Sequence, residues 1–116
     1  QEVSKVARAL KNIAKELGVA VIALSQLNRG VGMRNNSKPT MADLRESGEI
    51  EQAADIVALI YRPEYYGLYE DEQGNPTNGL AKIIFAKGRN IGVGEINLKF
   101  IADLTKFEDY EPSKGF

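Results

Sequence analysis

Apolar residues recur at three- and four-residue steps along residues 3–17, and this spacing predicts an amphipathic helix. Its apolar stripe consists of Val3, Val6, Ala7, Leu10, Ile13, Ala14 and Leu17. Gly18 follows at the position where helices commonly end on a left-handed residue. The polar side carries four cations, which we expect mainly to face solvent: Lys5, Arg8, Lys11 and Lys15.

An unbroken apolar run follows at 19–24, which is typical of a strand buried on both faces of a parallel sheet. Two further apolar runs, at 55–61 and 80–86, predict more strands, and a short helix is expected at 47–54. Because a helix followed by a buried strand is half of a βαβ unit, the order predicts an α/β fold with a mostly parallel sheet.

A fourth run, at 94–100, alternates apolar and polar residues, which indicates a strand with one wet face near a sheet edge. The glycine-rich link at 88–94 is expected to join it to the preceding strand in an antiparallel hairpin. A basic loop at 27–43 and a tyrosine-containing insertion at 62–79 separate the apolar elements. We expect residues 1–110 to form part of one domain. Residues from 105 onward are expected to fray, with 111–116 as a flexible tail.

Composition restricts the chemistry. The 116 residues include 15 Lys and Arg against 16 Asp and Glu, and no His or Cys. Disulfides, thiol nucleophiles, cysteine-bound zinc and histidine bases are therefore excluded within these residues. The net charge of -1 means that nucleic-acid binding would depend on local clusters. No run of 18 apolar residues occurs, so no membrane partner is expected. The chain starts at Gln1, and we expect an excised piece or a domain whose start is missing.

Polar residues follow the first predicted strand, where ligands bind in open α/β sheets. Gln26 there could orient a water or sense a phosphate, and Arg29 could pair with one. The alternative is a polar strand end that leads into a loop. At 43–52, clustered acids suggest a metal site, but a helix start with acids in its first turn is favoured. Ser47 is a candidate cap, and main-chain N–H groups at 46–48 could hold a phosphate.

Lys87 and Arg89 flank Gly88 at the tip of the predicted hairpin. Side chains two residues apart on an extended chain point the same way, so both cations could reach one anion. An Arg on a hairpin suits stabilisation of a phosphoryl group bound by a neighbouring subunit, although a solubilising turn is the alternative. A Walker A loop is absent, and no apolar strand ends in an acid for Mg²⁺. We therefore expect the chain alone to hold neither ATP nor Mg²⁺.

Several segments together closely resemble, over about residues 1–110, the C-terminal domain of the bacterial replicative DNA helicase DnaB. They are the first helix, Val21-Ile-Ala-Leu-Ser-Gln-Leu-Asn-Arg29, Asp43-Leu-Arg-Glu-Ser-Gly48 and Lys87-Gly-Arg-Asn90. The resemblance implies a partial RecA-like P-loop ATPase fold, namely the part that follows the strand carrying the Mg²⁺-holding acid. The chain departs from the family pattern after Asn90, where Ile91-Gly-Val replaces Gly-Pro.

The resemblance also implies residue roles. Gln26 matches the γ-phosphate sensor, Arg89 the arginine finger that reaches the neighbouring subunit's nucleotide, and Lys87 its companion cation. The loop that tracks single-stranded DNA is matched by Arg45, Glu46 and Gly48. The basic loop that contains Arg29 and Arg34 is similar to another channel-facing segment.

For the whole protein, the resemblance implies ATP and Mg²⁺, a homohexamer on single-stranded DNA, primase and a helicase loader as partners, and a cytoplasmic location. One alternative is a stand-alone single-stranded DNA-binding or assembly module of RecA-like ancestry. Another is a different RecA-like protein, such as a recombinase or circadian-type ATPase, against which the match at 43–52 argues.

Overall fold

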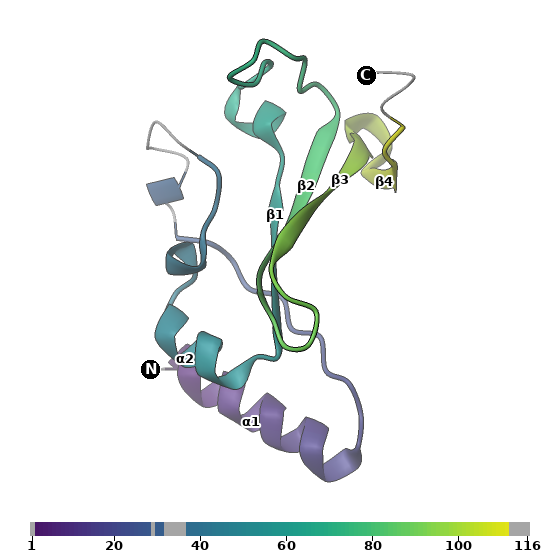
Figure 1. Ribbon diagram of the computed structural model, residues 1–116. Helices are drawn as coiled ribbons and strands as arrows, with labels where there is room; N and C mark the ends of the chain where they lie inside the picture. The colour runs from purple at the N-terminus through teal and green to yellow at the C-terminus, as the bar shows by residue number, and fades with distance from the viewer. Residues whose placement is uncertain (1, 29, 32–36, 112–116) are drawn as a thin grey trace.

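The computed structural model describes residues 2–28, 30–31 and 37–111 (Figure 1). Two helices lie at one end of a long, four-stranded sheet. The helices are α1 (Glu2–Leu17) and α2 (Ser47–Ala53). The strands are β1 (Ile56–Tyr61), β2 (Leu80–Gly88), β3 (Gly94–Ile101) and β4 (Lys106–Asp109). Short 3-10 turns occupy Met41–Asp43, Pro63–Tyr66 and Ala102–Leu104.

Every strand pair in this sheet is antiparallel, in the order β1-β2-β3-β4. The prediction of a mostly parallel sheet is therefore wrong for the described residues, while the predicted hairpin between β2 and β3 is confirmed. The physical reason lies in the connections, since a parallel pair needs a long crossover, usually a helix. Here tight turns join β2 to β3 and β3 to β4, and the 62–79 insertion folds back on itself through a bridge between Glu70 and Pro76.

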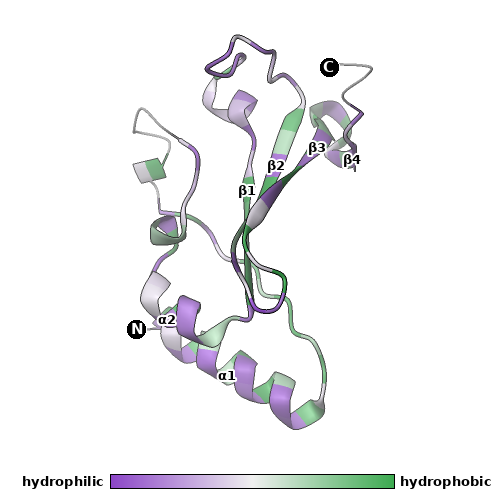
Figure 2. Cartoon of the chain, in the orientation of Figure 1, coloured by the Kyte–Doolittle hydropathy of each residue, from purple (hydrophilic) through white to green (hydrophobic). Residues whose placement is uncertain are grey.

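The predicted buried strand at 19–24 is also wrong. This segment runs on from α1 without strand pairing, and Ile22 and Leu24 are 91% and 96% exposed. An apolar run becomes a strand only where a neighbour satisfies its N–H and C=O groups, and none of the described strands lies alongside it. Figure 2 shows the hydrophobic colour of this connection, which continues from the apolar residues of α1.

The buried core lies where α2 meets the first strand. β1 alternates, with Val57, Leu59 and Tyr61 buried and Ile56 and Ile60 exposed, so this apolar strand buries one face only. A core cluster of Leu44, Val57 and Leu59 packs against Leu27, Met41, Ile50, Ala54, Ile84 and Ala86. This packing holds the end of α2 and β1 against Ile84 and Ala86 of β2.

Both predicted helices are confirmed, as is the end of α1 at Gly18, which has a φ of +64°. α2 begins after Glu46, a left-handed residue with a φ of 54°, so Ser47 is the first helical residue rather than the cap. The Glu46 carboxylate accepts hydrogen bonds from the N–H groups of Val3 and Ser4 at 3.2 and 3.3 Å. A carboxylate at the first turn of α1 complements the free N–H groups there, so Glu46 joins the two helices.

Two regions expected to be irregular have defined structure. Residues 106–109 form the edge strand β4, with Phe107 against Phe100 at 4.8 Å between ring centroids, so the prediction that they fray is wrong. In the 62–79 insertion, Arg62 lies 4.0 Å from the centroid of the Phe100 ring, and Thr77 is buried. Of the predicted tail at 111–116, residues 112–116 lie outside the described residues. In the described part of the chain, no helix is long and apolar enough to cross a membrane.

Candidate functional site

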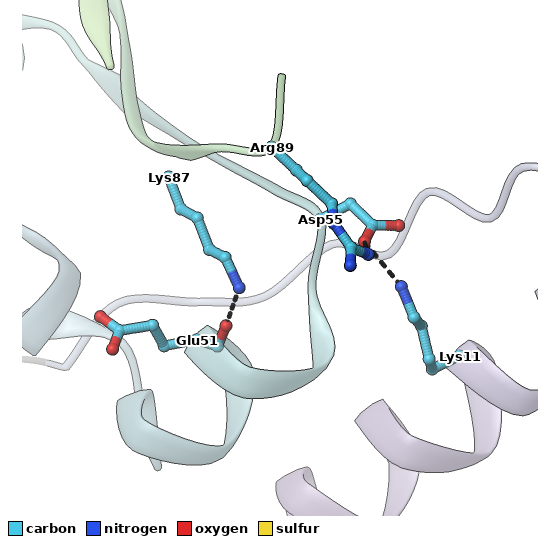
Figure 3. A network of polar contacts seen from close by, with 5 residues as sticks. All are labelled: Lys11, Glu51, Asp55, Lys87 and Arg89. Carbon is cyan, nitrogen blue, oxygen red and sulfur yellow. Dashed lines mark hydrogen bonds and ion pairs between the residues drawn. The ribbon is translucent and has the colours of Figure 1, made fainter. Parts of the chain in front are cut away.

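A hollow of about 400 Å³ lies where the β2–β3 turn meets the two helices. Figure 3 draws four of the residues that line it, Lys11, Asp55, Lys87 and Arg89. The hollow is lined by Lys11 and Lys15 of α1, by Gln52, Ala54 and Asp55, and by Lys87, Gly88 and Arg89. Four of these side chains are cations and one is an acid. This excess of positive charge favours binding of an anion with several oxygens, such as a phosphate chain.

The hairpin turn fixes where its two cations project. β2 pairs with β1 up to Gly88, which lies opposite Ile56, and the Gly92 N–H donates to the Gly88 carbonyl at 3.0 Å to close the turn. A Cβ on Gly88 would collide with the main-chain oxygen of Gly92 and with the side chain of Ile91. Glycine is therefore required directly before Arg89, and the Ile91-Gly-Val sequence forms a closed turn.

Arg89 is held twice by one residue. Its Nη1 donates to Oδ1 of Asp55 at 2.9 Å, and its main-chain N–H donates to the Asp55 carbonyl, also at 2.9 Å. The Arg89 side chain is 69% exposed and that of Asp55 is 52% exposed. Arg89 is thus held at its main-chain N–H and at its guanidinium, while most of its side chain faces solvent.

Lys11 of α1 reaches the same carboxylate oxygen, with its Nζ 2.7 Å from Asp55 Oδ1 (Figure 3). Hydrogen bonds from Lys11 and then from Arg89 hold the pKa of Asp55 below its ordinary range. The Asp55 side chain therefore stays ionised at neutral pH. Sequence reasoning missed both partners, because Asp55 was assigned to an apolar run and Lys11 to a solvated helix face.

Lys87 reaches a different partner at the same hollow. Its ammonium donates to the main-chain carbonyl of Glu51. Glu51 lies in the last turn of α2, where carbonyl groups lack helical partners and the helix dipole favours a cation. The structure thus places both predicted cations at one hollow, with Lys87 on the end of α2 and Arg89 on Asp55.

The other candidates lie apart from the hollow. Gln26 is exposed in the extended segment that precedes Leu27, and it does not line the hollow. Arg45 and Gly48 are exposed near the opposite end of α2 from Asp55, and Glu46 contacts α1. Arg29 and Arg34 fall outside the described residues.

The donor set of the hollow fits phosphate oxygens and does not fit Mg²⁺. Magnesium is held by carboxylate, carbonyl and phosphate oxygens, and Asp55 is the one acidic side chain that lines the hollow. Within the described part of the chain, no group of three His, Cys, Asp or Glu side chains could hold a metal ion.

Residues 1–109 match the family described as the DnaB-like helicase C terminal domain. The chain is 50% identical over 111 residues to "Replicative DNA helicase DnaC" of Bacillus subtilis (strain 168). It is 49% identical over 111 residues to "Replicative DNA helicase DnaB" of Geobacillus stearothermophilus. Each match covers 96% of this chain and 23% of the relative, so the chain spans about a quarter of the length of these curated relatives.

Two solved structures resemble the chain, each with a TM-score of 0.81 at 41% identity over 94% of its length. One is described as an ATPase domain, of which 37% is covered. The other is described as the structure of a DnaB-like replicative helicase and its interactions with primase, of which 25% is covered. The antiparallel sheet and two helices therefore share their fold with part of each of these structures.

Proposed function

Because this chain belongs to the DnaB-like helicase C-terminal domain family, we propose that it is part of the ATP-dependent motor domain of a hexameric replicative DNA helicase. In this proposal the chain supplies the side of the ATP site that comes from the neighbouring subunit. The observation that carries it is the projection of Arg89 and Lys87 from one closed hairpin over a cationic hollow. ATP and Mg²⁺ would be held mainly by residues outside these 116.

Arg89 is the proposed arginine finger. Phosphoryl transfer develops charge on the equatorial oxygens, and catalysis depends on positioned cations that meet this charge. A guanidinium offers several fixed donors to those oxygens, whereas the Lys87 ammonium adds a compact charge. The Gly88 turn supports this assignment, because it gives the finger a defined root on the sheet.

Single-stranded DNA is the proposed track, contacted by Arg45 and Glu46 in the loop before α2 and by Gly48 in the first turn of α2. Contacts to the DNA backbone carry no sequence information directly, which suits a motor that steps along any strand. α2 has seven residues and spans about 10 Å between this loop and the hollow. A shift of the loop would therefore be transmitted to the residues around Asp55.

Gln26 is the proposed γ-phosphate sensor, and its surroundings suggest how it would signal. The next residue, Leu27, forms a bridge with Leu44, and the Asn28 N–H donates to the Asp43 carbonyl at 2.8 Å. Leu44 directly precedes Arg45. A movement of Gln26 would therefore reach the DNA-tracking loop through main-chain bonds.

Arg29 and Arg34 are proposed as further channel-facing cations. Primase and a helicase loader are the proposed partners of the whole protein.

The test is Arg89→Ala in the full-length helicase. We expect DNA-stimulated ATP hydrolysis to fall by about 10³-fold or more, with nucleotide binding changed less than about twofold. Lys106→Ala is the matched control, because Lys106 is an exposed cation that pairs with Glu108 on the edge strand. Hydrolysis at the normal rate in Arg89→Ala would overturn the proposal.

A mixing experiment tests whether Arg89 acts across the subunit boundary. Subunits with Arg89→Ala would be combined with subunits inactivated in their own phosphate-cradling loop, outside this chain. If the finger serves the neighbour, mixed hexamers regain hydrolysis that neither parent shows. A mixture as inactive as its parents would contradict action between subunits.

A further inference from the structure

Asp55 joins three segments that are far apart in the sequence. Its carboxylate contacts Lys11 on α1 and Arg89 on the hairpin, while its main chain links α2 to β1. Its carbonyl also accepts the Arg89 N–H. The resemblance to the helicase family assigned Asp55 and Lys11 no function, although both line the hollow with Arg89.

We propose that Asp55 is the positioning residue for Arg89, and that Lys11 balances its charge so that an incoming phosphate can approach. This inference rests on the proposed function of Arg89 as a finger. Asp55 itself contacts no phosphate in this scheme. Its effect on hydrolysis passes through the orientation of the Arg89 guanidinium.

Arg89 has enough N–H donors to bind Asp55 and a phosphate at the same time. A guanidinium carries five N–H donors, and the contact with Asp55 engages Nη1. The other donors stay available to phosphate oxygens, so Asp55 does not have to release Arg89 when the neighbour's nucleotide arrives. Without this contact, a side chain that is 69% exposed would sample many rotamers and lose that freedom on binding.

Lys11 removes the obstacle that a lone carboxylate would create. A negative charge beside the finger repels phosphate oxygens, but Lys11 shares the Asp55 oxygen that Arg89 binds. Lys11 also belongs to a 16-residue helix, so the carboxylate is braced against an extended element. Lys15 and Lys87 complete a hollow whose net charge stays positive.

Asp55→Asn separates positioning from mere structural support. The amide keeps the shape of the side chain and leaves the main-chain bond to Arg89 intact, while the charge is lost. In the full-length helicase we expect kcat for DNA-stimulated hydrolysis to fall about tenfold, with KM for ATP within about twofold. Lys11→Met is expected to lower kcat in the same direction by about threefold, since it removes one part of the support.

Glu49→Gln is the matched control. Glu49 of α2 forms an ion pair with Arg8 of α1 at 3.2 Å, and both side chains are about half exposed. Glu49→Gln removes an exposed ion pair of α1 without touching Arg89, so kcat should stay within about twofold. Circular dichroism at the assay temperature establishes that each variant is folded.

A double-mutant cycle gives the decisive result. If Asp55 acts through Arg89, then Asp55→Asn added to Arg89→Ala causes no further loss of the residual single-turnover rate. A further loss of about tenfold, or a kcat in Asp55→Asn equal to that of the unaltered protein, would overturn the inference. If Arg89→Ala is inactive and Asp55→Asn is fully active, only this inference fails. If Arg89→Ala is itself active, the proposed function fails too.

Discussion

Leu27 and Leu44 form an isolated antiparallel bridge that joins the segment carrying Gln26 to the loop carrying Arg45. Leu44 is 7% exposed and belongs to the core cluster with Val57 and Leu59, while Leu27 packs against that cluster. The residue that follows the proposed sensor thus pairs with the buried residue that precedes the proposed DNA contact. The same point lies beside α2, whose far end leads to Asp55.

Leu44→Ala is expected to lower the free energy of unfolding by about 2–4 kcal/mol, because truncation leaves a cavity between the loop and β1. Urea unfolding followed by circular dichroism measures this loss. Leu104→Ala is the control, since Leu104 is 66% exposed and its truncation should cost less than about 0.5 kcal/mol. Equal losses in the two variants would show that Leu44 does not anchor the loop.

Gly88→Ala is expected to reduce DNA-stimulated hydrolysis about tenfold or more, because the added Cβ displaces the turn that carries Arg89. Gly94→Ala is the matched control at the other end of the turn. A Cβ there meets no atom within 4 Å, and Gly94 does not have a positive φ. Steady-state ATPase assays compare the two variants. Equal activity would mean that the function of Arg89 does not depend on the geometry of the turn.

The sequence predicted the elements whose signals are local. The stripe along α1, its end at Gly18 and the β2–β3 hairpin follow from spacings within a few residues. The direction of the sheet did not follow, because pairing depends on which strands meet and on the connections between them. The run at 19–24 showed the same limit, since its composition fits a strand while its burial depends on a neighbour.

The candidate site divides in the same way. Lys87 and Arg89 were found because both lie on one short hairpin. Asp55 and Lys11 were missed because Asp55 lies 34 residues before its partner Arg89 and 44 residues after its partner Lys11. A single sequence does not indicate which residues pair over such separations. The position of Asp55 directly before the strand that pairs with the hairpin of Arg89 was nevertheless a usable signal.

Lowering the pH is expected to destabilise the 62–79 insertion, because the carboxylate of Asp71 becomes protonated. Main-chain N–H groups of Asn75 and Gln73 donate to its carboxylate at 2.8 and 2.9 Å. These bonds, that from Asn75 foremost, hold the pKa of Asp71 below its ordinary value of 3.8. A lowered pKa in the folded state adds stability above about pH 4, and this contribution is lost as the pH falls through the lowered value.

Asp71→Asn should therefore be less stable than the unaltered protein at pH 5–7, with a difference that shrinks below about pH 4. Thermal unfolding across this pH range measures the difference. A gap between the two proteins that widens toward low pH would contradict the assignment of these bonds to the charged carboxylate.

Arg45→Ala tests the DNA-tracking loop through the salt dependence of binding. Each phosphate neutralised on a single strand adds about 0.7 to the slope of log affinity against log salt concentration, because counterions are released. Arg45 is exposed at the start of the loop before α2, so its loss should weaken affinity for single-stranded DNA and make this slope shallower by about 0.7. Fluorescence anisotropy of labelled oligonucleotides at several salt concentrations gives both quantities. Lys99→Ala, which removes an exposed cation from β3, should leave both unchanged. A weaker affinity with an unaltered slope would mean that Arg45 shapes the loop without touching a phosphate.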